Sequence, residues 1–182
     1  ILPNYLSYLF QWLREYGFSA WEDIYELVDS QSGKQVFSSE FRLIKDRNTL
    51  ILAPINKMES SEVYFINEDQ LEVNDPIKLT ISNQNFYSNT DNSIIFVDAD
   101  KLKFPLQLKR FERGAIFQPF GMNGKSKKVS KLFKDEKLSL LQKENTWILY
   151  SNEDIVWVIG IRQDERFKIN IDTKNSLQIA LK

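Results

Sequence analysis

Apolar residues at the start of the chain recur at the spacing of an amphipathic helix. They follow an i, i+3, i+4, i+7 pattern at Leu2, Tyr5, Leu6, Leu9, Leu13 and Tyr16. Pro3 suits the first turn of a helix, where no backbone donor is needed, and Gly17 suits the residue after the last turn. The pattern therefore predicts a first helix that ends near Gly17.

A second helix is predicted directly afterwards. Residues 19–22, Ser-Ala-Trp-Glu, match a capping box, in which the Ser and Glu side chains accept hydrogen bonds from free N–H groups of the first turn. The apolar stripe that follows consists of Trp21, Ile24, Leu27 and Val28, and residues 31–33, Gln-Ser-Gly, end it. Two helices joined by so few residues predict an antiparallel helical hairpin.

After residue 33 apolar residues alternate with polar ones, which is the period of a β-strand. Strands are expected near residues 36–37, 41–45, 50–52, 63–66, 77–81, 94–97, 106–111, 147–150, 155–159, 167–171 and 177–181. The polar residues 56–61 mark the best position for a boundary. We therefore expect an α+β chain, with a helical hairpin and a β-hairpin in residues 1–57 and a mainly antiparallel β domain in residues 58–182.

One later segment, residues 127 to about 136, has helical periodicity and would be inserted in the β domain. At about 100° per residue, its lysines share one face and its apolar residues share the opposite face. The lysines are Lys127, Lys131 and Lys134, with Lys128 on the flank, and the apolar residues are Val129, Leu132 and Phe133. With Ser126 as N-cap, the stripe of lysines would be about 10 Å long. It would fit the phosphates of one nucleic-acid strand, although any solvated helix face has a similar pattern.

The composition narrows the possible chemistry. The chain has 182 residues, 42% of them hydrophobic and 27% charged, as in a folded globular protein. The absence of Cys and His excludes thiolate nucleophiles, imidazole bases, disulfides and zinc sites built on these residues. No apolar run exceeds about seven residues, so we expect neither a membrane-spanning helix nor a signal peptide. Because the chain begins with Ile1 and not Met, we expect further sequence upstream.

The net charge of −1 conceals an uneven distribution. Residues 101–137 hold eleven Lys or Arg against three Asp or Glu, a local charge of +8 that leaves −9 for the rest of the chain. A dense positive segment attracts polyanions, while the acidic remainder repels them and restricts their orientation. The charge pattern therefore favours nucleic-acid binding, although solvated charge runs also occur on ordinary surfaces.

Two motifs resemble ligand-binding loops but depart from them. Residues 124–126, Gly-Lys-Ser, match the end of a nucleotide-binding Walker loop, yet the first glycine of that motif would fall on Pro119. Gly121 and Gly124 are expected to provide turns with positive φ. Residues 98–100, Asp-Ala-Asp, lack the later Gly and Glu of a calcium loop, so a turn is expected.

A pair of carboxylates, Asp164 and Glu165, lies between Arg162 and Arg166. Paired carboxylates can serve as general acid and base, but mixed charge at the end of a β-hairpin is much more common. We therefore expect no catalytic or metal-ligating residue in this chain.

Several motifs carry a family resemblance. They are Phe-Pro-Leu at 104–106, Phe-Gln-Pro-Phe-Gly-Met-Asn-Gly-Lys-Ser-Lys-Lys-Val-Ser at 117–130, Phe-Lys-Asp-Glu-Lys at 133–137, Ile-Val-Trp-Val-Ile-Gly-Ile-Arg at 155–162 and Glu-Arg-Phe at 165–167. Over residues 95–182 the chain resembles the C-terminal domain of bacterial tRNA(Ile)-lysidine synthetases, and residues 17–18, 32–34 and 45–50 resemble the middle region of that family. The family's Gly-Asp-Arg is here Gly114-Ala115-Ile116, so no role is carried over to positions 115 and 116.

The resemblance implies a C-terminal fold akin to a domain of the phenylalanyl-tRNA synthetase β subunit. It implies a cytoplasmic parent enzyme that joins lysine to C2 of the wobble cytidine of an isoleucine tRNA, using ATP and Mg²⁺. That chemistry belongs to an N-terminal domain with a Ser-Gly-Gly-x-Asp-Ser loop, a motif absent from these 182 residues. The chain would need no cofactor of its own and would bind the acceptor stem beside the catalytic domain, as a monomer or a homodimer.

We expect basic residues of the charged segment and two later arginines to contact the tRNA. The candidates are Lys109, Arg110, Arg113, Lys125, Lys127, Lys128, Lys131, Lys134, Arg162 and Arg166. Arginine can bind a phosphate through two parallel hydrogen bonds, and lysine binds it as a point charge. An A-form stem hides its major-groove base edges, so phosphates, 2′-hydroxyls and shape are the expected contacts.

Two functions of other classes stay open on the sequence alone. A protein-interaction module would use the helical hairpin or a sheet edge, and it would bind nucleic acid without specificity. A free-standing enzyme would need a pocket in which carboxylates or lysines converge.

Overall fold

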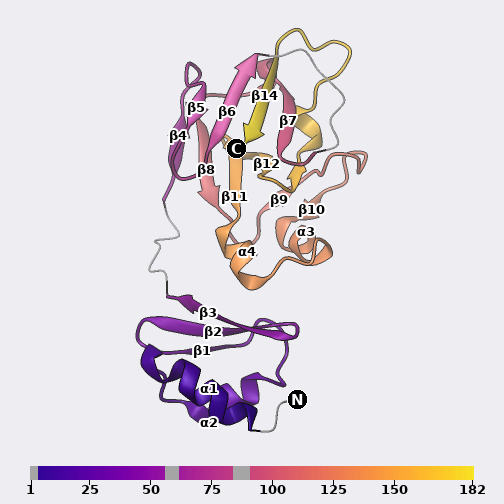
Figure 1. Ribbon diagram of the computed structural model, residues 1–182. Coiled ribbons are helices and arrows are strands. Elements are labelled where there is room, and N and C mark those ends of the chain that lie inside the picture. Colours follow the sequence, from indigo (N-terminus) through magenta and orange to yellow (C-terminus); the bar gives the residue numbers. More distant parts are fainter. Residues whose placement is uncertain (1–3, 56–61, 84–90) are drawn as a thin grey trace. The chain divides into compact units, whose positions relative to one another are not determined.

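The computed structural model describes residues 4–55, 62–83 and 91–182. The chain divides into two compact units, residues 1–59 and residues 60–182, and the boundary expected after residue 57 lies outside the described residues. Each unit combines helices with antiparallel sheets (Figure 1), so the α+β class is confirmed. No helix in the described ranges is long and apolar enough to cross a membrane.

The first unit combines two α-helices with one sheet. Its elements are α1 (Tyr5–Leu13), the 3-10 helix η1 (Arg14–Tyr16), α2 (Trp21–Leu27), β1 (Gln35–Phe37), β2 (Phe41–Asp46) and β3 (Thr49–Pro54). The strands pair antiparallel in the order β1-β2-β3. Leu13, Ile24 and Leu27 from the helices share a buried core with Val36 and Leu43 from the strands. The helical and alternating spacings thus predicted the buried faces.

The ends of the two helices agree with the sequence prediction at one point and differ at another. Gly17, with φ of 72°, follows η1 in the left-handed conformation that glycine adopts without steric cost. The capping box predicted at residues 19–22 is wrong, because α2 has Ala20 at its N-cap and no side chain caps its first turn.

The second unit is mainly antiparallel sheet. Its strands are β4 (Tyr64–Ile66), β5 (Glu72–Val73), β6 (Leu79–Asn83), β7 (Ile94–Asp98), β8 (Leu106–Arg110), β9 (Ile116–Phe117), β10 (Lys127–Lys128), β11 (Trp147–Ser151), β12 (Asp154–Val158), β13 (Arg162–Gln163) and β14 (Ser176–Leu181). Its helices are α3 (Val129–Asp135), α4 (Leu140–Asn145) and the 3-10 turns η2 (Ala99–Lys101) and η3 (Glu165–Phe167). The sheets have the orders β13-β12-β11-β8-β4, β5-β6-β14-β7 and β10-β9.

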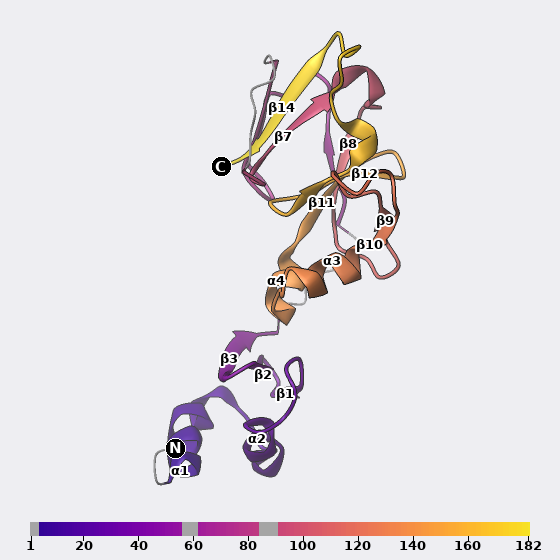
Figure 2. The same ribbon diagram turned by 90° about the vertical axis from the view of Figure 1, so that its right-hand side faces the viewer.

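The five-stranded sheet is covered on both faces. Successive side chains of a strand point to opposite faces. Trp147 and Leu149 of β11 accordingly join a core with the four-stranded sheet, whereas Ile148 joins a second core with α3. In Figure 2, β7 and β14 lie on one side of β8, β11 and β12. Helix α3 lies below these strands, near the lower end of β11. Burial on both faces explains why β12 is apolar without alternation.

Helix α3 begins two residues later than the periodicity predicts. Lys127 and Lys128 pair with Phe117 and Ile116 as β10, so the helix starts at Val129. Lys128 is its N-cap residue, and the N-cap predicted at position 126 is wrong. The buried face is confirmed and consists of Val129, Leu132 and Phe133. The backbone pairing of β10 therefore removes Lys127 from the helix.

Two further segments differ from the sequence prediction. Helix α4 was not expected, although Ser139 and Gln142 form a capping box in which each accepts a hydrogen bond from the backbone of the other. The strand expected at residues 167–171 is wrong, because η3 turns the chain there and residues 168–175 run without strand pairing of their own, apart from one bridge between Lys168 and Val97.

The carboxylate of Asp164 anchors the loop between β9 and β10. Its side chain is fully buried. Oδ2 accepts a 2.9 Å hydrogen bond from the Gln118 amide, and Nε and Nη2 of Arg166 donate 2.9 Å bonds to its two oxygens. Residues 118 and 165 are also joined through their backbones, over 2.6 Å. The loop thus starts from a fixed position on the second unit.

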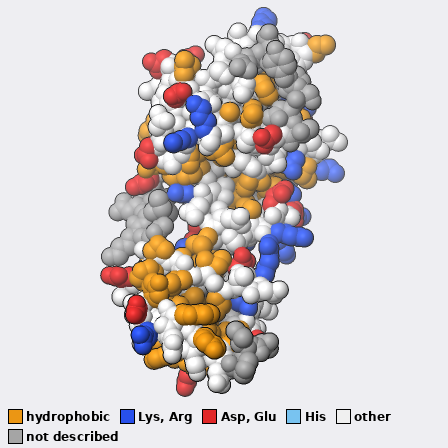
Figure 3. Space-filling view, viewed as in Figure 1, with side chains coloured by type: hydrophobic (Ala, Val, Ile, Leu, Met, Phe, Trp, Pro, Cys, Tyr) orange, Lys and Arg blue, Asp and Glu red, His pale blue; other side chains and the backbone are white. Residues whose placement is uncertain are grey.

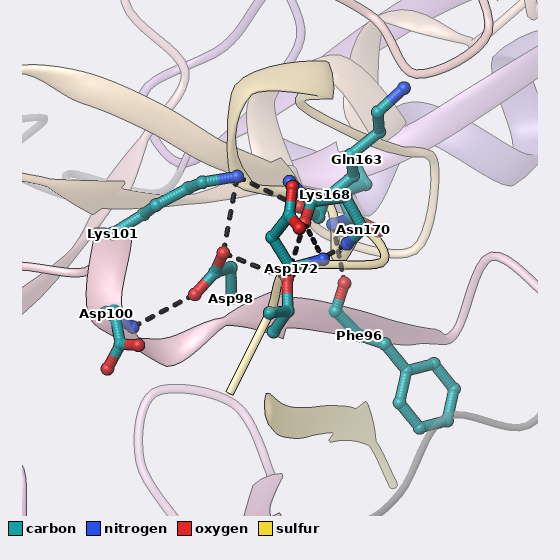
Figure 4. A network of polar contacts seen from close by, with 9 residues as sticks. Phe96, Asp98, Asp100, Lys101, Gln163, Lys168, Asn170 and Asp172 are labelled. Atoms are coloured by element: carbon teal, nitrogen blue, oxygen red, sulfur yellow. Dashed lines mark hydrogen bonds and ion pairs between the residues drawn. The ribbon is translucent and has the colours of Figure 1, made fainter. Parts of the chain in front are cut away.

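Strand β13 and the segment after it are tied to β7 and η2 beside the four-stranded sheet (Figure 4). Gln163 Nε2 donates a 2.8 Å hydrogen bond to the carbonyl oxygen of Phe96. Lys101 Nζ lies 3.4 Å from Asp98 Oδ2 and donates a 3.2 Å bond to the carbonyl oxygen of Lys168. Asp98 also accepts from the Asp100 amide, so the turn predicted at residues 98–100 is confirmed. These bonds hold the anchor of the β9–β10 loop between two sheets.

We predict that Asp164→Asn lowers the free energy of unfolding by about 1.5 to 3 kcal/mol, the range for hydrogen bonds to charged groups. Asp154→Asn is the matched control, because Asp154 pairs with the same Arg166 but is 58% exposed, and such surface pairs contribute at most about 1 kcal/mol. Urea unfolding measures the difference, and amide exchange at Gln118 reports the loop locally. Equal effects of the two variants would contradict the anchoring role.

Candidate nucleic-acid interface

The ten basic residues expected to contact tRNA fall into two groups. Five have side-chain partners within the protein, namely Lys109, Arg110, Lys127, Arg162 and Arg166. Within the described ranges, the side chains of the other five form no hydrogen bond, ion pair or ring contact: Arg113, Lys125, Lys128, Lys131 and Lys134. We call this second group the basic surface.

Two of the partnered residues cover aromatic rings of β11. Arg110 Cζ lies 3.9 Å from the ring centre of Trp147, and its Nη1 donates a 2.5 Å bond to the carbonyl oxygen of Asn145. Burial lowers the pKa of Arg110 from its ordinary value. Lys109 Nζ lies 5.2 Å from the ring centre of Tyr150, and burial raises the pKa of that phenol to about 12. Both cations stabilise the sheet through cation–π contacts.

Lys127 is held against the C-terminal end of α3. Its Nζ lies 2.8 Å from Asp135 Oδ2, and its side chain is 15% exposed. The hydrogen bond from Lys127 lowers the pKa of Asp135. The stripe predicted to include Lys127 is therefore wrong, whereas Lys131 and Lys134 both lie on the exposed face of the helix.

The two later arginines also have carboxylate partners. Arg162 Nη2 lies 3.6 Å from Glu136 Oε1 at the end of α3. Arg166 is bound by Asp164 and Asp154, and its hydrogen bonds with Asp164 raise its pKa. These arginines join segments of the fold to one another.

The chain topology brings the basic surface together from three neighbouring segments. Arg113 lies in the turn before β9, Lys125 in the loop, and the remaining three in β10 and α3. The Val129 amide donates a 2.9 Å bond to the carbonyl oxygen of Ala115, which joins the start of α3 to the turn that carries Arg113. Figures 1 and 2 both place α3 beside the β9–β10 hairpin.

Two successive tight turns shape the loop of this hairpin. The Met122 amide donates to the carbonyl oxygen of Pro119, and the Lys125 amide donates to that of Met122, over 3.1 Å in each case. The first turn has Gly121 at φ 85°, and the second has Asn123 at φ 52° and Gly124 at φ 74°. Two central residues with positive φ are the mark of a type I′ turn, for which Asn-Gly is the preferred pair. The positive-φ glycines expected from the sequence are confirmed.

The stretch that carries the basic surface contains no acidic residue, although Glu112 and Asp135 border it directly. Residues 113–134 contain six Lys or Arg and no Asp or Glu. After this stretch, Asp135 is paired with Lys127 and Glu136 with Arg162, and the charges of Lys131 and Lys134 also help to lower the pKa of Asp135. Within the described residues, the five cations of the basic surface form no ion pair, so they can bind an external anion.

Two features of this site were not predicted from the sequence. The sequence around Asp164 predicts a charged residue at the protein surface, but the residue is buried and anchors the loop. No pattern in the sequence distinguishes these two roles. Three apolar side chains of the hairpin are exposed, with Ile116 at 53%, Phe120 at 49% and Met122 at 36%. A phenylalanine between Pro and Gly in a turn could have signalled this exposure, because neither neighbour belongs to a buried strand.

The first unit presents a different surface. Exposed aromatic side chains occur on α1 and β1 at Tyr8, Phe10, Trp12 and Phe37, and hydrophobic side chains gather over this unit in Figure 3. An open groove of about 430 Å³ lies between α2 and β1, and its lining includes Asp23, Glu26 and Lys34. No group of acidic side chains in the described ranges could hold a metal ion.

Two regions of the chain match models of known protein families. The model described as the TilS substrate binding domain matches residues 2–55. The model described as the TilS substrate C-terminal domain matches residues 106–179, which include the whole basic surface.

Curated relatives bear the name tRNA(Ile)-lysidine synthase. The protein from Parabacteroides distasonis is 39% identical over 93% of this chain, and the one from Bacteroides thetaiotaomicron is 36% identical over 92%. The chain spans 40% and 38% of the length of these two relatives.

A solved structure described as a TilS C-terminal domain has the same fold. It matches with a TM-score of 0.55 at 16% identity, over 65% of this chain and 95% of that structure. The fold, the two family models and the curated relatives agree. This chain belongs to the tRNA(Ile)-lysidine synthase family and contains two regions found in its members, the substrate-binding domain and the C-terminal domain.

Proposed function

We propose that this chain is the tRNA-binding part of a tRNA(Ile)-lysidine synthase, and that its basic surface contacts phosphates of the tRNA acceptor stem. The observation that carries the proposal is the group of five cations whose side chains form no hydrogen bond, ion pair or ring contact in the described part of the chain, set on a hairpin and helix that the fold holds in place. Lys127 of the same segment supports it, because it pairs with Asp135, the acid next to Lys134.

The shape of an RNA stem favours this kind of contact. An A-form duplex presents phosphates and 2′-hydroxyls at its surface and keeps its major-groove base edges out of reach. Lys131 and Lys134 are three residues apart and lie on the same face of α3, so both can approach one strand. Such contacts fix position and orientation and leave the base sequence unread.

The ligation chemistry belongs, in this proposal, to a part of the parent enzyme outside this chain. The family joins lysine to the wobble cytidine with ATP and Mg²⁺ in a domain that carries a Ser-Gly-Gly-x-Asp-Ser loop, and these 182 residues lack that motif. The chain would hold the isoleucine tRNA by its acceptor stem while the catalytic domain of the same protein acts on the anticodon.

A second candidate function concerns the first unit. Its exposed Tyr8, Phe10 and Trp12 favour contact with an apolar protein surface, since α1 itself contains no charged residue to bind phosphate. In that function the first unit would be a protein-interaction module and the second unit would bind the RNA.

We predict that the double variant Lys131→Gln/Lys134→Gln weakens tRNA binding and flattens its salt dependence. Each lost phosphate contact lowers the slope of log K against log salt by about 0.7 to 0.9, so the pair should lower it by about 1.4 to 1.8. Filter binding or fluorescence anisotropy over a salt series measures this slope.

The matched control is Lys78→Gln/Lys174→Gln. It removes the same charge from two exposed lysines that flank the four-stranded sheet. We expect the control to keep nearly the wild-type slope. If the control lowered the slope as much as the α3 variant does, the basic surface would contribute only nonspecific charge, and the proposal would be contradicted.

We also predict that an isolated acceptor-stem minihelix competes with whole tRNA for this chain, whereas an anticodon stem-loop competes poorly. The basic surface occupies one hairpin and one short helix, which fits a single helical segment, and the remainder of the chain carries −9 outside residues 101–137. Competition anisotropy with labelled tRNA tests this. Tighter competition by the anticodon arm would contradict the acceptor-stem assignment.

A further inference from the structure

Phe120 combines an exposed ring with a fixed backbone. Its side chain is 49% exposed, although a phenylalanine ring usually adds to stability by burial. Its amide donates a 2.9 Å hydrogen bond to the carbonyl oxygen of Gln163, and the next amide, of Gly121, donates a 2.7 Å bond to Glu165 Oε2. These two hydrogen bonds fix the backbone on both sides of the ring, and we call this fixed backbone the frame. The exposure of the ring is thus a property of an ordered loop and does not result from fraying of the chain.

The frame around Phe120 extends to the five-stranded and the four-stranded sheet of the second unit. Gln163, which accepts from the Phe120 amide, also bonds to Phe96 of β7 (Figure 4). Glu165, which accepts from the Gly121 amide, pairs with Lys168. A ring on such a frame loses little entropy when it binds a flat ligand, because its position is already set.

The chemistry around the ring favours an aromatic anion. Met122, 36% exposed, closes the turn that contains Phe120, and the Lys168 ammonium, which pairs with Glu165, lies 5.8 Å from the centre of the Phe120 ring. Lys125 follows in the second turn without a side-chain partner in the described part of the chain. A nucleotide has both a flat base and a charged phosphate, and thus matches an apolar ring in the same loop as the Lys125 ammonium.

A base inside a duplex cannot use this ring, because its faces are covered by its neighbours in the stack. Unpaired nucleotides next to a stem have free faces and phosphates that continue the strand. An apolar protein segment would suit the ring, but it would not match the positive charge of the basic surface on the same hairpin.

We infer that Phe120 is a stacking platform for an unpaired nucleotide that extends from the end of the RNA stem bound by the basic surface. This inference rests on the proposed function, since the basic surface must first place the stem. It adds a subsite that distinguishes an RNA stem with a single-stranded extension from a blunt stem.

The test compares two RNA hairpins that share one stem, one blunt and one with a four-nucleotide 3′ extension. With the wild-type chain, the extension should raise affinity roughly 5- to 150-fold, the range for stacking of one base. Phe120→Ala should abolish this gain and leave binding of the blunt hairpin unchanged. Phe120→Trp should retain the gain, because the larger ring also stacks.

Ile116→Ala is the matched control, since Ile116 is an equally exposed apolar side chain of the same hairpin, and it should keep the gain. A 2-aminopurine in the extension gives an independent signal, because its fluorescence is quenched on stacking with wild type and not with Phe120→Ala. Urea unfolding checks that the variants fold alike.

The proposed function and the stacking platform are contradicted by different results. If the blunt hairpin binds and the extension adds nothing, or if Phe120→Ala keeps the gain, the platform is overturned and the proposed function stands. An exposed Phe120 would then serve a protein contact. If neither hairpin binds the wild-type chain, both the proposed function and the platform are overturned.

Discussion

The arrangement of the candidate interface depends on one buried carboxylate. Asp164 is fully buried, and a buried charge is tolerated only when it is paired and hydrogen-bonded. Arg166 and the Gln118 amide meet this requirement from two directions. The same bonds fix the start of the β9–β10 loop, and through β10 the start of α3. A constraint on burying charge thus determines where the lysines of the surface lie.

The distribution of cations between fold and surface follows from this arrangement. Lys127 and Arg162 occupy the carboxylates at the end of α3, and Arg110 packs on the ring of Trp147. Cations that are paired internally must break those contacts before they can bind a phosphate, whereas Lys131 and Lys134 have no hydrogen bond or ion pair to break among the described residues. The number of basic residues in the segment therefore overstates the number available to an external anion, because several of them are paired within the fold.

Local patterns in the sequence predicted much of this structure. Alternation located most strands, and the helical stripe of Val129, Leu132 and Phe133 identified the buried face of α3. Predictions failed where distant backbone contacts decide the outcome. Pairing with β9 makes Lys127 part of a strand, although its periodicity suits a helix. The burial of Asp164 likewise depends on residues 46 positions away along the chain. The family resemblance found the segment that the C-terminal family model matches, but only the fold distinguishes cations that have partners among the described residues from those that have none.

The most direct test of the account is a lysine footprint with and without isoleucine tRNA. Brief acetylation of the whole chain, followed by mass spectrometry, reports the reactivity of each lysine in a single experiment. The account predicts that tRNA protects Lys125, Lys128, Lys131 and Lys134, while the exposed Lys78 stays reactive. Uniform protection, or protection confined to lysines outside residues 113–134, would contradict the assignment of the interface to the β9–β10 hairpin and α3.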